Sequence, residues 1–337
     1  MVQGKTIGYP VPPWRGSPYV PPADVAPATF TILVYYPHFF GEGFERDIDL
    51  EPDMGVPVRC RFTRDREALE DADAVLMHLP AAGGPLPEKR AGQKWIAMSM
   101  ESALNCPALA DAGDPDRYDI EMSYRRGADV PALYFEAAAY RNFRREGLRV
   151  PRIADPAPVL YLASNPVPER DDFVRDLSRH IGVDSYGRCL NNRDWRDVER
   201  GLDAREPEQS LIAAYRFYLA IENSRCDDYV TEKLLRALAV GTVPVYRGAP
   251  NIRELLPDPD AVVSTDDFDT PADLAAYLRR LLADPSAMAR HLAWRNKPWP
   301  ASFAALVSVG SVPARERLAI KLAHGCGREC CCGGRLV

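Results

Sequence analysis

Short apolar segments alternate with helix-forming segments along most of the chain, and this alternation restricts the fold more than any other feature. The apolar segments are rich in β-branched and aromatic residues, which is typical of buried strands. The clearest strands are predicted at 30–37, 56–63, 94–101, 157–164, 215–221 and 242–246. Repeated alternation of strand and helix favours an α/β fold, in which helices cover both faces of parallel sheets.

Two helices of the second half carry clear start signals. The segment "TPADLAAYLRRLLAD" has Thr270 as its predicted N-cap and Pro271 at the first helical position. The segment "DPSAMARHLAWR" repeats this start with Asp284. A third helix, "ERDDFVRDLSRHIG", ends at a glycine. The residues predicted to face inwards are Leu274, Leu278, Leu281 and Leu282 on the first helix, and Phe173, Val174, Leu177 and Ile181 on the third.

The length of the chain favours more than one domain. A single hydrophobic core rarely grows to 337 residues. The segment 140–156 is basic and interrupted by proline, so it is a candidate linker between two α/β halves. We predict two doubly wound, Rossmann-like domains that face a cleft, at 29–155 and 156–305, with a Pro-rich arm at 1–28 and a tail at 306–337.

Composition and charge exclude several classes of function. The formal net charge of −6 argues against nucleic-acid binding, which needs a basic surface. No apolar run approaches 18 residues and the N-terminus has no hydrophobic signal region, so neither a transmembrane segment nor a secretory signal is predicted. We therefore expect a cytoplasmic protein with reduced thiols, and leave peripheral membrane contact open. The clustered Cys326, Cys330, Cys331 and Cys332 leave open metal binding, lipidation or a disordered end.

One stretch, "FYLAIENSRCDDYVTEKLLRALAVGTVPVYRGAP", gathers polar residues where a buried strand turns into a helix. In open α/β sheets, ligands bind beyond the carboxyl ends of strands, near helix N-termini. A helix predicted at about 229–240, beginning near Asp228, would offer unpaired N–H groups to a phosphate, and Lys233 would add a positive charge. Arg225 and Arg247 are further candidate cations.

The other polar residues of this stretch suit a sugar. The carboxylates of Glu222 and Glu232 could bind sugar hydroxyls or stabilise positive charge on a sugar ring, Asn223 could bind hydroxyls, and Tyr229 offers an aromatic face. The chain has no G-x-G-x-x-G or P-loop signature, so a nucleotide sugar fits better than a dinucleotide. Alternatively, Asp228 is only a helix cap and Glu232 forms a surface pair with the residue four positions on.

The segments "FYLAIENS", "DYVTEKL" and "GTVPVYRGAPNI", in this order, closely resemble the signature of the α-1,3-fucosyltransferases, glycosyltransferase family 10. The supporting segments "KWIAMSMESALNCP", "YDIEMSYRRGADVP", "VDSYGRCLNNR" and "DDFDTPADLAAYL" also occur in order, so the resemblance spans about 30–296. "VDSYGRCLNNR" and "VPVYRGAPNIRELLP" are most similar to the branch that contains the protein O-fucosyltransferases of EMI domains.

This resemblance implies a GT-B fold, GDP-fucose as donor and inversion at the anomeric carbon. Inversion needs a general base that deprotonates the attacking hydroxyl on the side opposite the leaving diphosphate. The resemblance implies that this base is Glu101. The family usually has Ser-Pro after that glutamate, whereas this chain has Ser102 and Ala103.

The resemblance also implies a set of donor-binding residues, Arg188, Asn223, Tyr229, Glu232 and Lys233. Lys233 and Arg188 would neutralise charge on the GDP leaving group, with Arg193 as a competitor for the role of Arg188. Glu232 would contact the fucose, and Tyr229 and Asn223 would hold the nucleotide. No obligatory metal is expected, because the GT-B arrangement stabilises the diphosphate without one.

The acceptor is less constrained than the donor. The resemblance implies an α-1,3-type linkage. Because the chain is rich in Ala, Arg, Asp and Pro, as in proteins of GC-rich bacteria, we expect a glycan acceptor. The alternatives are a protein O-fucosyltransferase that modifies Ser or Thr of a folded domain, and a non-catalytic nucleotide-sugar-binding protein. The expected partners are therefore GDP-fucose and a glycan or glycoprotein acceptor.

Overall fold

The structure of the chain is a computed structural model. It describes residues 28–36, 47–50, 58–83, 86–134, 148–310 and 312–323. The predicted Pro-rich arm lies outside these residues except for its last position, and so do the four clustered cysteines. The chain divides into two compact units, which are described separately below.

The boundary between the units differs from the predicted one. The second unit is Tyr134–Val307, and the first unit combines the chain before Tyr134 with the chain from Ser308 onwards. The division therefore lies about twenty residues before the predicted boundary at 155/156. The candidate linker at 140–156 is described only from 148, where it already belongs to the second unit.

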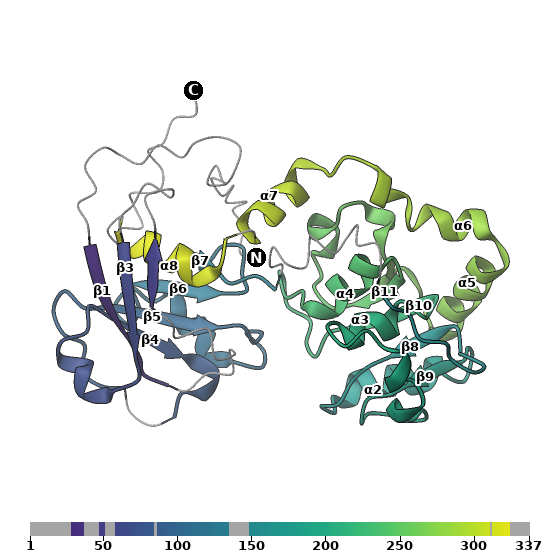
Figure 1. The fold of residues 1–337 in the computed structure, drawn as a ribbon, viewed down its shortest axis with the longest axis horizontal. Helices are drawn as coiled ribbons and strands as arrows, with labels where there is room; N and C mark the ends of the chain where they lie inside the picture. Colours follow the sequence, from purple (N-terminus) through teal and green to yellow (C-terminus); the bar gives the residue numbers. More distant parts are fainter. Residues whose placement is uncertain are drawn as a thin grey trace. The chain divides into compact units, whose positions relative to one another are not determined.

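The first unit contains a seven-stranded sheet (Figure 1). Its strands are β1 (Ala28–Val34), β2 (Ile48–Leu50), β3 (Val58–Thr63), β4 (Ala74–His78), β5 (Lys94–Ser99), β6 (Ile120–Ser123) and β7 (Val130–Pro131). Their order is β2-β3-β1-β4-β5-β6-β7, and only the pairing of β2 with β3 is antiparallel. The connections carry short 3-10 helices, η2 (Arg66–Glu70), η3 (Leu79–Ala81) and η4 (Pro107–Gly113).

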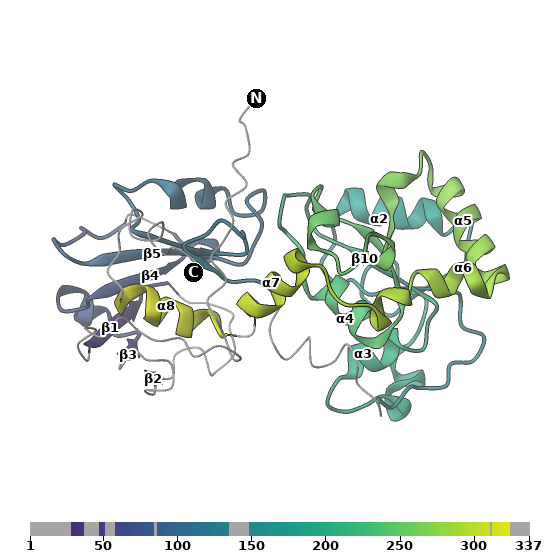
Figure 2. The ribbon, with the colours of Figure 1, turned by 90° about the horizontal axis from the view of Figure 1, so that it is seen from above.

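The helix α8 (Ala314–Ala323) completes the core of this unit. Leu318, Ala319 and Leu322 are buried in one cluster with residues of the strands, and Lys321 Nζ lies 3.2 Å from Asp129 Oδ1. Figures 1 and 2 show α8, in yellow, against the purple and blue strands. The prediction of a tail at 306–337 is therefore wrong for this helix, because its apolar stripe is buried in the core of the first unit.

The second unit contains a five-stranded parallel sheet. Its strands are β8 (Val159–Tyr161), β9 (Val183–Ser185), β10 (Phe217–Ile221), β11 (Val243–Arg247) and β12 (Val263–Ser264). Its helices are α2 (Pro168–Leu177), α3 (Pro207–Ile212), α4 (Glu232–Val240), α5 (Pro271–Ala283), α6 (Pro285–Arg290) and most of α7 (Ala301–Gly310), whose last residues belong to the first unit. The 3-10 helices are η6 (Trp195–Asp197), η7 (Glu199–Gly201), η8 (Ile252–Leu255), η9 (Pro259–Ala261), η10 (Thr265–Asp267) and η11 (Ala293–Asn296).

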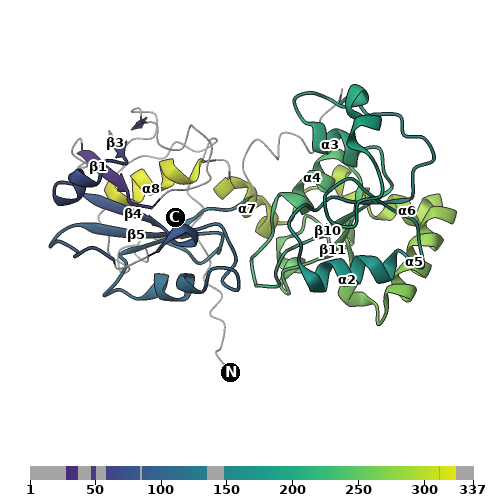
Figure 3. The same cartoon turned by 90° about the horizontal axis from the view of Figure 1, so that it is seen from below.

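Helices cover both faces of this second sheet. Figure 3 shows α3 and α4 on one face and α2 and α5 on the other, and α3 contacts α4 while α2 contacts α5. The predicted caps of α5 and α6 are confirmed: Thr270 Oγ1 accepts from the N–H of Asp273 at 3.2 Å, and Asp284 Oδ1 from that of Ser286 at 2.9 Å. Leu282, predicted to face inwards, is 40% exposed, because its neighbour Leu281 occupies the buried stripe.

The strand order of the second sheet, β12-β11-β10-β8-β9, locates a ligand crevice. The chain passes from β8 to β9 on one side and then crosses back to β10 on the other side. In a doubly wound sheet, ligands bind beyond the carboxyl ends of the strands at such a reversal of order. A ligand site is therefore expected at the carboxyl ends of β8 and β10. No helix within the described ranges is both long and apolar enough to span a bilayer.

Candidate functional site

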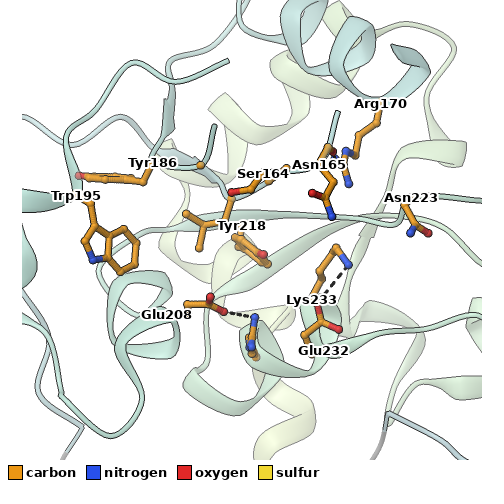
Figure 4. Close-up of a pocket in the computed structure, with 14 residues that line it drawn as sticks. Ser164, Asn165, Arg170, Tyr186, Trp195, Glu208, Tyr218, Asn223, Glu232 and Lys233 are labelled. Carbon is orange, nitrogen blue, oxygen red and sulfur yellow. Dashed lines mark hydrogen bonds and ion pairs between the residues drawn. The ribbon is translucent and has the colours of Figure 1, made fainter. Parts of the chain in front are cut away.

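A polar cavity of about 370 Å³ lies at the carboxyl ends of β8 and β10, where the strand order reverses (Figure 4). The loop after β8 contributes Ser164 and Asn165, and the loop after β10 contributes Asn223. Glu232 and Lys233 reach the cavity from the first turn of α4. The strand that carries "FYLAI" and the helix that follows it thus form one wall of the cavity.

The two ends of the cavity differ in chemistry. Tyr186 and Trp195 lie together at one end, with ring centroids 6.1 Å apart in an edge-to-face arrangement. Figure 4 shows that Arg170, Asn223 and Lys233 lie towards the other end. Aromatic faces suit a planar base, whereas cations and amides suit phosphate and sugar oxygens. The cavity therefore has the composition that a nucleotide sugar requires.

The floor of the cavity depends on a glycine. A Cβ atom on Gly187 would lie 2.1 Å from the carbonyl oxygen of Ala163, which no side chain can tolerate. The same oxygen accepts a hydrogen bond of 2.9 Å from the N–H of Cys189. The loops after β8 and β9 are therefore packed backbone to backbone beneath the cavity. Glycine allows this close approach because it has no side chain.

The start of α4 differs from the prediction. The helix begins at Glu232, and its N-cap is Thr231, whose Oγ1 lies 3.5 Å from the N–H of Lys233. Asp228, which was predicted to begin the helix, has a left-handed backbone with φ of 64°. Its carboxylate accepts a hydrogen bond of 2.9 Å from Asn251 Nδ2, so a tertiary contact holds the preceding turn. Because of this contact, the helix begins about one helical turn later than predicted, and Lys233 lies in the first turn of the helix.

Glu222 points into the protein rather than towards a sugar. Its carboxylate accepts hydrogen bonds from the N–H of Thr231 at 2.8 Å and from Thr231 Oγ1 at 2.7 Å. It also lies 3.4 Å from Lys233 Nζ, and the residue is only 4% exposed. Burial raises the pKa of Glu222, although Lys233 and Thr231 oppose this effect. The buried carboxylate of Glu222 thus anchors Thr231, the N-cap of α4, and the side chain of Lys233.

Lys233 and Glu232 remain charged at the cavity wall. Lys233 Nζ lies 2.9 Å from Thr231 Oγ1 and 3.3 Å from Glu232 Oε1. Burial lowers the pKa of Lys233, but Glu222 and Glu232 outweigh it, so the pKa lies above its ordinary value. Burial likewise works against ionisation of Glu232, but Lys233 and Arg236 leave its pKa below the ordinary value. Arg236 itself forms an ion pair with Glu208 of α3.

Tyr229 lies away from the cavity. Its ring is buried edge-on against Tyr134, with centroids 6.4 Å apart, and it does not line the cavity wall. Of the predicted donor-binding residues, the structure therefore brings together Asn223, Glu232 and Lys233, and leaves Tyr229 in the core beneath the loop. Its proposed contact with the nucleotide stays a prediction.

The two candidate arginines of the loop after β9 differ in their contacts. Arg193 uses Nε to bind Asp184 at 2.8 Å, and its terminal nitrogens bind the carbonyls of Ala154 and Asp155 at 3.3 and 2.5 Å. These bonds fix it as a structural residue of the second unit. Arg188 is exposed, and within the described ranges no hydrogen bond or ion pair holds its guanidinium. Arg188 does not line the cavity, so its role also stays a prediction.

Glu101, the predicted base, belongs to the first unit. It follows β5, where its N–H donates to Ser99 Oγ at 3.1 Å. Its Oε2 accepts a long hydrogen bond of 3.4 Å from Asn105 Nδ2. The N–H of Ala103 donates to the hydroxyl of Tyr124 at 3.2 Å, a bond that the family's usual proline could not make. A proline in place of Ala103 would therefore remove a hydrogen bond that holds the turn after Glu101.

Sequence reasoning missed several residues of the cavity, above all Arg170. This arginine lies on the stripe of α2 that also carries Val174 and Leu177, and it is buried. A charged residue on an apolar helical stripe was the available signal, because arginine is rarely buried without a specific reason. Tyr186 and Trp195 gave no comparable signal, because their loop lies far in sequence from the strand–helix motif.

The first two aspartates of "DDFD" are held by arginines. Asp266 accepts two hydrogen bonds from Arg225, of 3.1 and 2.7 Å, and Asp267 accepts one of 2.7 Å from Arg253. In the part of the chain that the structure describes, no three His, Cys, Asp or Glu residues gather into a group that could hold a metal ion.

Two doubly wound α/β units, the second with a nucleotide-type cavity at its switch point, define the GT-B class of glycosyltransferase fold. The description "Fucosyltransferase, N-terminal" matches residues 27–135, and "Glycosyltransferase family 10 (fucosyltransferase) C-term" matches residues 157–311. The chain belongs to glycosyltransferase family 10.

Two similar proteins carry the name GDP-fucose protein O-fucosyltransferase 3. The protein of that name from Xenopus tropicalis is 30% identical over 259 residues, which are 70% of this chain and 53% of the relative. The one from Danio rerio is 41% identical over 163 residues, which are 47% of this chain and 34% of the relative. The chain thus spans about half the length, or less, of the curated relatives that it matches.

Two solved structures share the fold. A crystal structure of an α1,3-fucosyltransferase with GDP-fucose superposes with a TM-score of 0.58 at 15% identity, covering 88% of this chain and 91% of that one. A second, with GDP, has a TM-score of 0.51 at 17% identity and covers 90% and 93%. These likenesses support the GT-B architecture.

Proposed function

We propose that this chain transfers fucose from GDP-fucose, with inversion, to a Ser or Thr hydroxyl of a protein. The observation that carries this proposal is the similarity to proteins named GDP-fucose protein O-fucosyltransferase 3, 30% identical over 70% of this chain. This similarity favours the alternative of a protein acceptor over the α-1,3-linked glycan acceptor that the resemblance and the composition suggested.

The cavity of the second unit binds the donor in this proposal. Lys233 and the N-terminus of α4 form part of one wall of the cavity. There they attract the diphosphate and stabilise the charge on departing GDP. Tyr186 and Trp195 provide aromatic surface for the base. The carboxylate of Glu232 stays ionised and is available to the fucose ring as it gains positive charge.

The reaction itself is a single displacement. The acceptor oxygen attacks the anomeric carbon while the bond from that carbon to the β-phosphate oxygen breaks. Glu101 accepts the proton of the acceptor hydroxyl, and GDP leaves with the bonding electrons. The cations of the protein neutralise the leaving group, so this proposal requires no metal.

An acceptor array tests the proposal. Labelled GDP-fucose is incubated with the protein and with folded Ser/Thr-containing domains or glycans, and the site of label is identified by mass spectrometry. We expect fucosyl-Ser or fucosyl-Thr, which Glu101→Gln reduces at least 100-fold. Glu67→Gln, an exposed carboxylate of the same unit, serves as the matched control and should leave turnover unchanged.

Each other outcome of the array has a definite meaning. If only glycans were labelled, the acceptor would be an α-1,3-linked glycan and not a protein. Binding of GDP-fucose without transfer to any acceptor would support the non-catalytic alternative. Full turnover by Glu101→Gln would remove Glu101 from the role of general base.

A further inference from the structure

A second polar cavity, of about 500 Å³, lies beyond the carboxyl ends of β11 and β12. Arg247 is the last residue of β11 and Thr265 follows β12, and both line the cavity. The helices α2 and α5 contribute Phe173 and Leu274. Arg225 and Arg247, the two further cations that the sequence offered for a phosphate, therefore both belong to this second cavity.

The second cavity adjoins the proposed donor cavity. Asn223 lines the proposed donor cavity, and Arg225, two residues further along the same loop, lines the second one. In the first turn of α2, Arg170 lines the proposed donor cavity, while the preceding residue, Glu169, contacts Arg247 of the second cavity. Asn223 and Arg170 lie at the end away from the aromatic pair (Figure 4). A molecule in the second cavity would therefore lie beside the sugar and phosphate end of the donor.

The guanidinium of Arg247 is held in place and is still accessible. It lies over the ring of Phe173, with Cζ 4.8 Å from the ring centroid, and its side chain is 19% exposed. An arginine that stacks on an aromatic ring presents the N–H groups along the edge of its planar fork, which match the oxygens of a carboxylate. Arg247 is thus arranged to bind a carboxylate before any ligand arrives.

Glu169 shows which chemistry this guanidinium binds. Its Oε1 lies 2.5 Å from a terminal nitrogen of Arg247, and its side chain is 75% exposed. An ion pair with so exposed a partner stabilises a fold little, so another carboxylate can replace Glu169 easily. Arg225 is less available, because it donates to both oxygens of Asp266, at 3.1 and 2.7 Å.

We infer that Arg247 binds the side-chain carboxylate of an Asp or Glu residue of the acceptor protein, and that Glu169 occupies this position until the acceptor binds. The acceptor hydroxyl must reach the fucose, so an acidic residue close to that hydroxyl would enter the neighbouring cavity. Arg247 selects the acceptor in this way and takes no part in the displacement itself. This inference rests on the proposed function, because it concerns the protein acceptor of that reaction.

Acceptor kinetics test the role of Arg247. The substrates are the folded domain that the acceptor array labels best, and a copy in which the Asp and Glu residues around the labelled hydroxyl are changed to Asn and Gln. We expect Arg247→Gln to raise KM for the first domain about 10-fold and to leave kcat and GDP affinity nearly unchanged. With the amide copy, Arg247→Gln should change KM less than about 2-fold, because the partner carboxylates are already absent.

Glu169→Gln distinguishes acceptor binding from a structural ion pair. If Glu169 competes with the acceptor, its removal should lower KM for the acidic domain about 2- to 5-fold. If the pair with Arg247 were only structural, Glu169→Gln and Arg247→Gln should both raise KM. Asp269→Asn removes a negative charge from the cavity lining and should also lower KM.

Each charge change has a matched control. Arg253→Gln removes an exposed arginine that pairs with Asp267 at 2.7 Å and does not line the cavity. Asp172→Asn removes a carboxylate of α2 that is 72% exposed and pairs with Arg175. Both should leave KM unchanged. Thermal melting establishes that each variant folds, and if Arg247→Gln does not fold, Arg247→Lys and Glu169→Gln carry the comparison of the two domains.

Several outcomes would overturn the inference and leave the proposed function standing. These are equal effects of Arg247→Gln on the two domains, a rise in KM with Glu169→Gln, and a best-labelled domain without an acidic residue near its labelled hydroxyl. A loss of GDP affinity in Arg247→Gln would assign Arg247 to the donor instead. Label on glycans alone, or on no acceptor, would overturn the proposed function and the inference together.

Discussion

At the scale of single residues, Glu222 is a position where a substitution should lower the stability of the fold. Its buried carboxylate accepts two hydrogen bonds from Thr231 and lies 3.4 Å from Lys233 Nζ. Glu222→Gln leaves one of these donors unsatisfied and removes the counter-charge of a lysine. We expect the free energy of unfolding, measured in urea, to fall by about 2–4 kcal/mol.

Glu232 provides the control for this substitution. Its side chain is 41% exposed at the cavity, so Glu232→Gln should change the free energy of unfolding by less than about 1 kcal/mol while it reduces transfer. Unchanged stability of Glu222→Gln would show that the buried contacts of Glu222 contribute little to the fold.

Lys233 leads to a prediction about pH. Burial lowers its pKa, but the two neighbouring carboxylates outweigh burial and raise the pKa above the ordinary value of 10.5. The lysine therefore stays protonated between pH 7 and about pH 9. We expect GDP affinity, measured by calorimetry, to be constant over this range, and Lys233→Ala to lose at least about 10-fold. If the GDP affinity of the native chain fell towards pH 9, and the affinity of Lys233→Ala did not, the lysine would be losing its charge in this range. That result would contradict the prediction.

At the scale of elements, the two loops beneath the cavity depend on Gly187. A Cβ atom at this position would lie 2.1 Å from the Ala163 carbonyl oxygen, so the backbone of one loop must move. We expect Gly187→Ala to lose about 2 kcal/mol or more of unfolding free energy and to weaken GDP binding as well. Gly113→Ala is the control, because nothing lies within 4 Å of the added atom. If Gly187→Ala and Gly113→Ala had the same unfolding free energy, a tight contact between the two loops would be excluded.

The pairing of β5 with β6 is reinforced by Asp119. Its carboxylate accepts from the N–H of Trp95 at 2.7 Å and pairs with Lys89 Nζ at 2.8 Å and Lys94 Nζ at 3.3 Å. Burial raises the pKa of Asp119, but these partners outweigh it and bring the pKa below its ordinary value of 3.8. The folded state therefore favours the ionised form, which stabilises it above about pH 4 and is lost as the pH falls further.

Asp119→Asn should thus lose about 1–2 kcal/mol of unfolding free energy at pH 7, and the difference from the native chain should narrow below about pH 4. Urea unfolding at both pH values measures this difference. Asp116→Asn, at an exposed position of the same unit, is the control. A difference that does not change with pH would mean that the charge of Asp119 is not what stabilises the strands.

At the scale of the whole molecule, the chain leaves the first unit and returns to it through α8. Leu318 is fully buried in the core of the first sheet, so Leu318→Ala should lose about 2–4 kcal/mol. Because the proposed donor cavity lies in the other unit, GDP affinity should stay unchanged. Leu104→Ala, at a leucine that is 66% exposed, should cost little.

Scanning calorimetry with and without GDP measures the effect of Leu318→Ala. The variant should lower the transition of the first unit, whereas GDP should raise the transition of the second unit by binding its folded state. A single transition that responds equally to both changes would mean that the two units unfold as one.

Periodicity and caps were sufficient to predict most elements of the second unit. The apolar segments became parallel strands, and Thr270 and Asp284 begin α5 and α6 as expected. The start of α4 could not be predicted, because the contact of Asp228 with Asn251 joins residues 23 positions apart. The assignment of α8 to a tail failed for the same reason, because the partner of this helix is a sheet formed by residues far earlier in the chain.

The sequence by itself determined the α/β class, the strand–helix motif of the donor loop and the family resemblance, because these depend on residue types at short, regular spacings. Only the tertiary structure decided which polar residues share a cavity. It turned Glu222 inwards, buried Tyr229, committed Arg193 to Asp184, and brought Arg170 and Lys233 to the same end of one cavity. The physical reason is that strand order and loop packing join residues far apart in sequence, and no local pattern specifies those contacts.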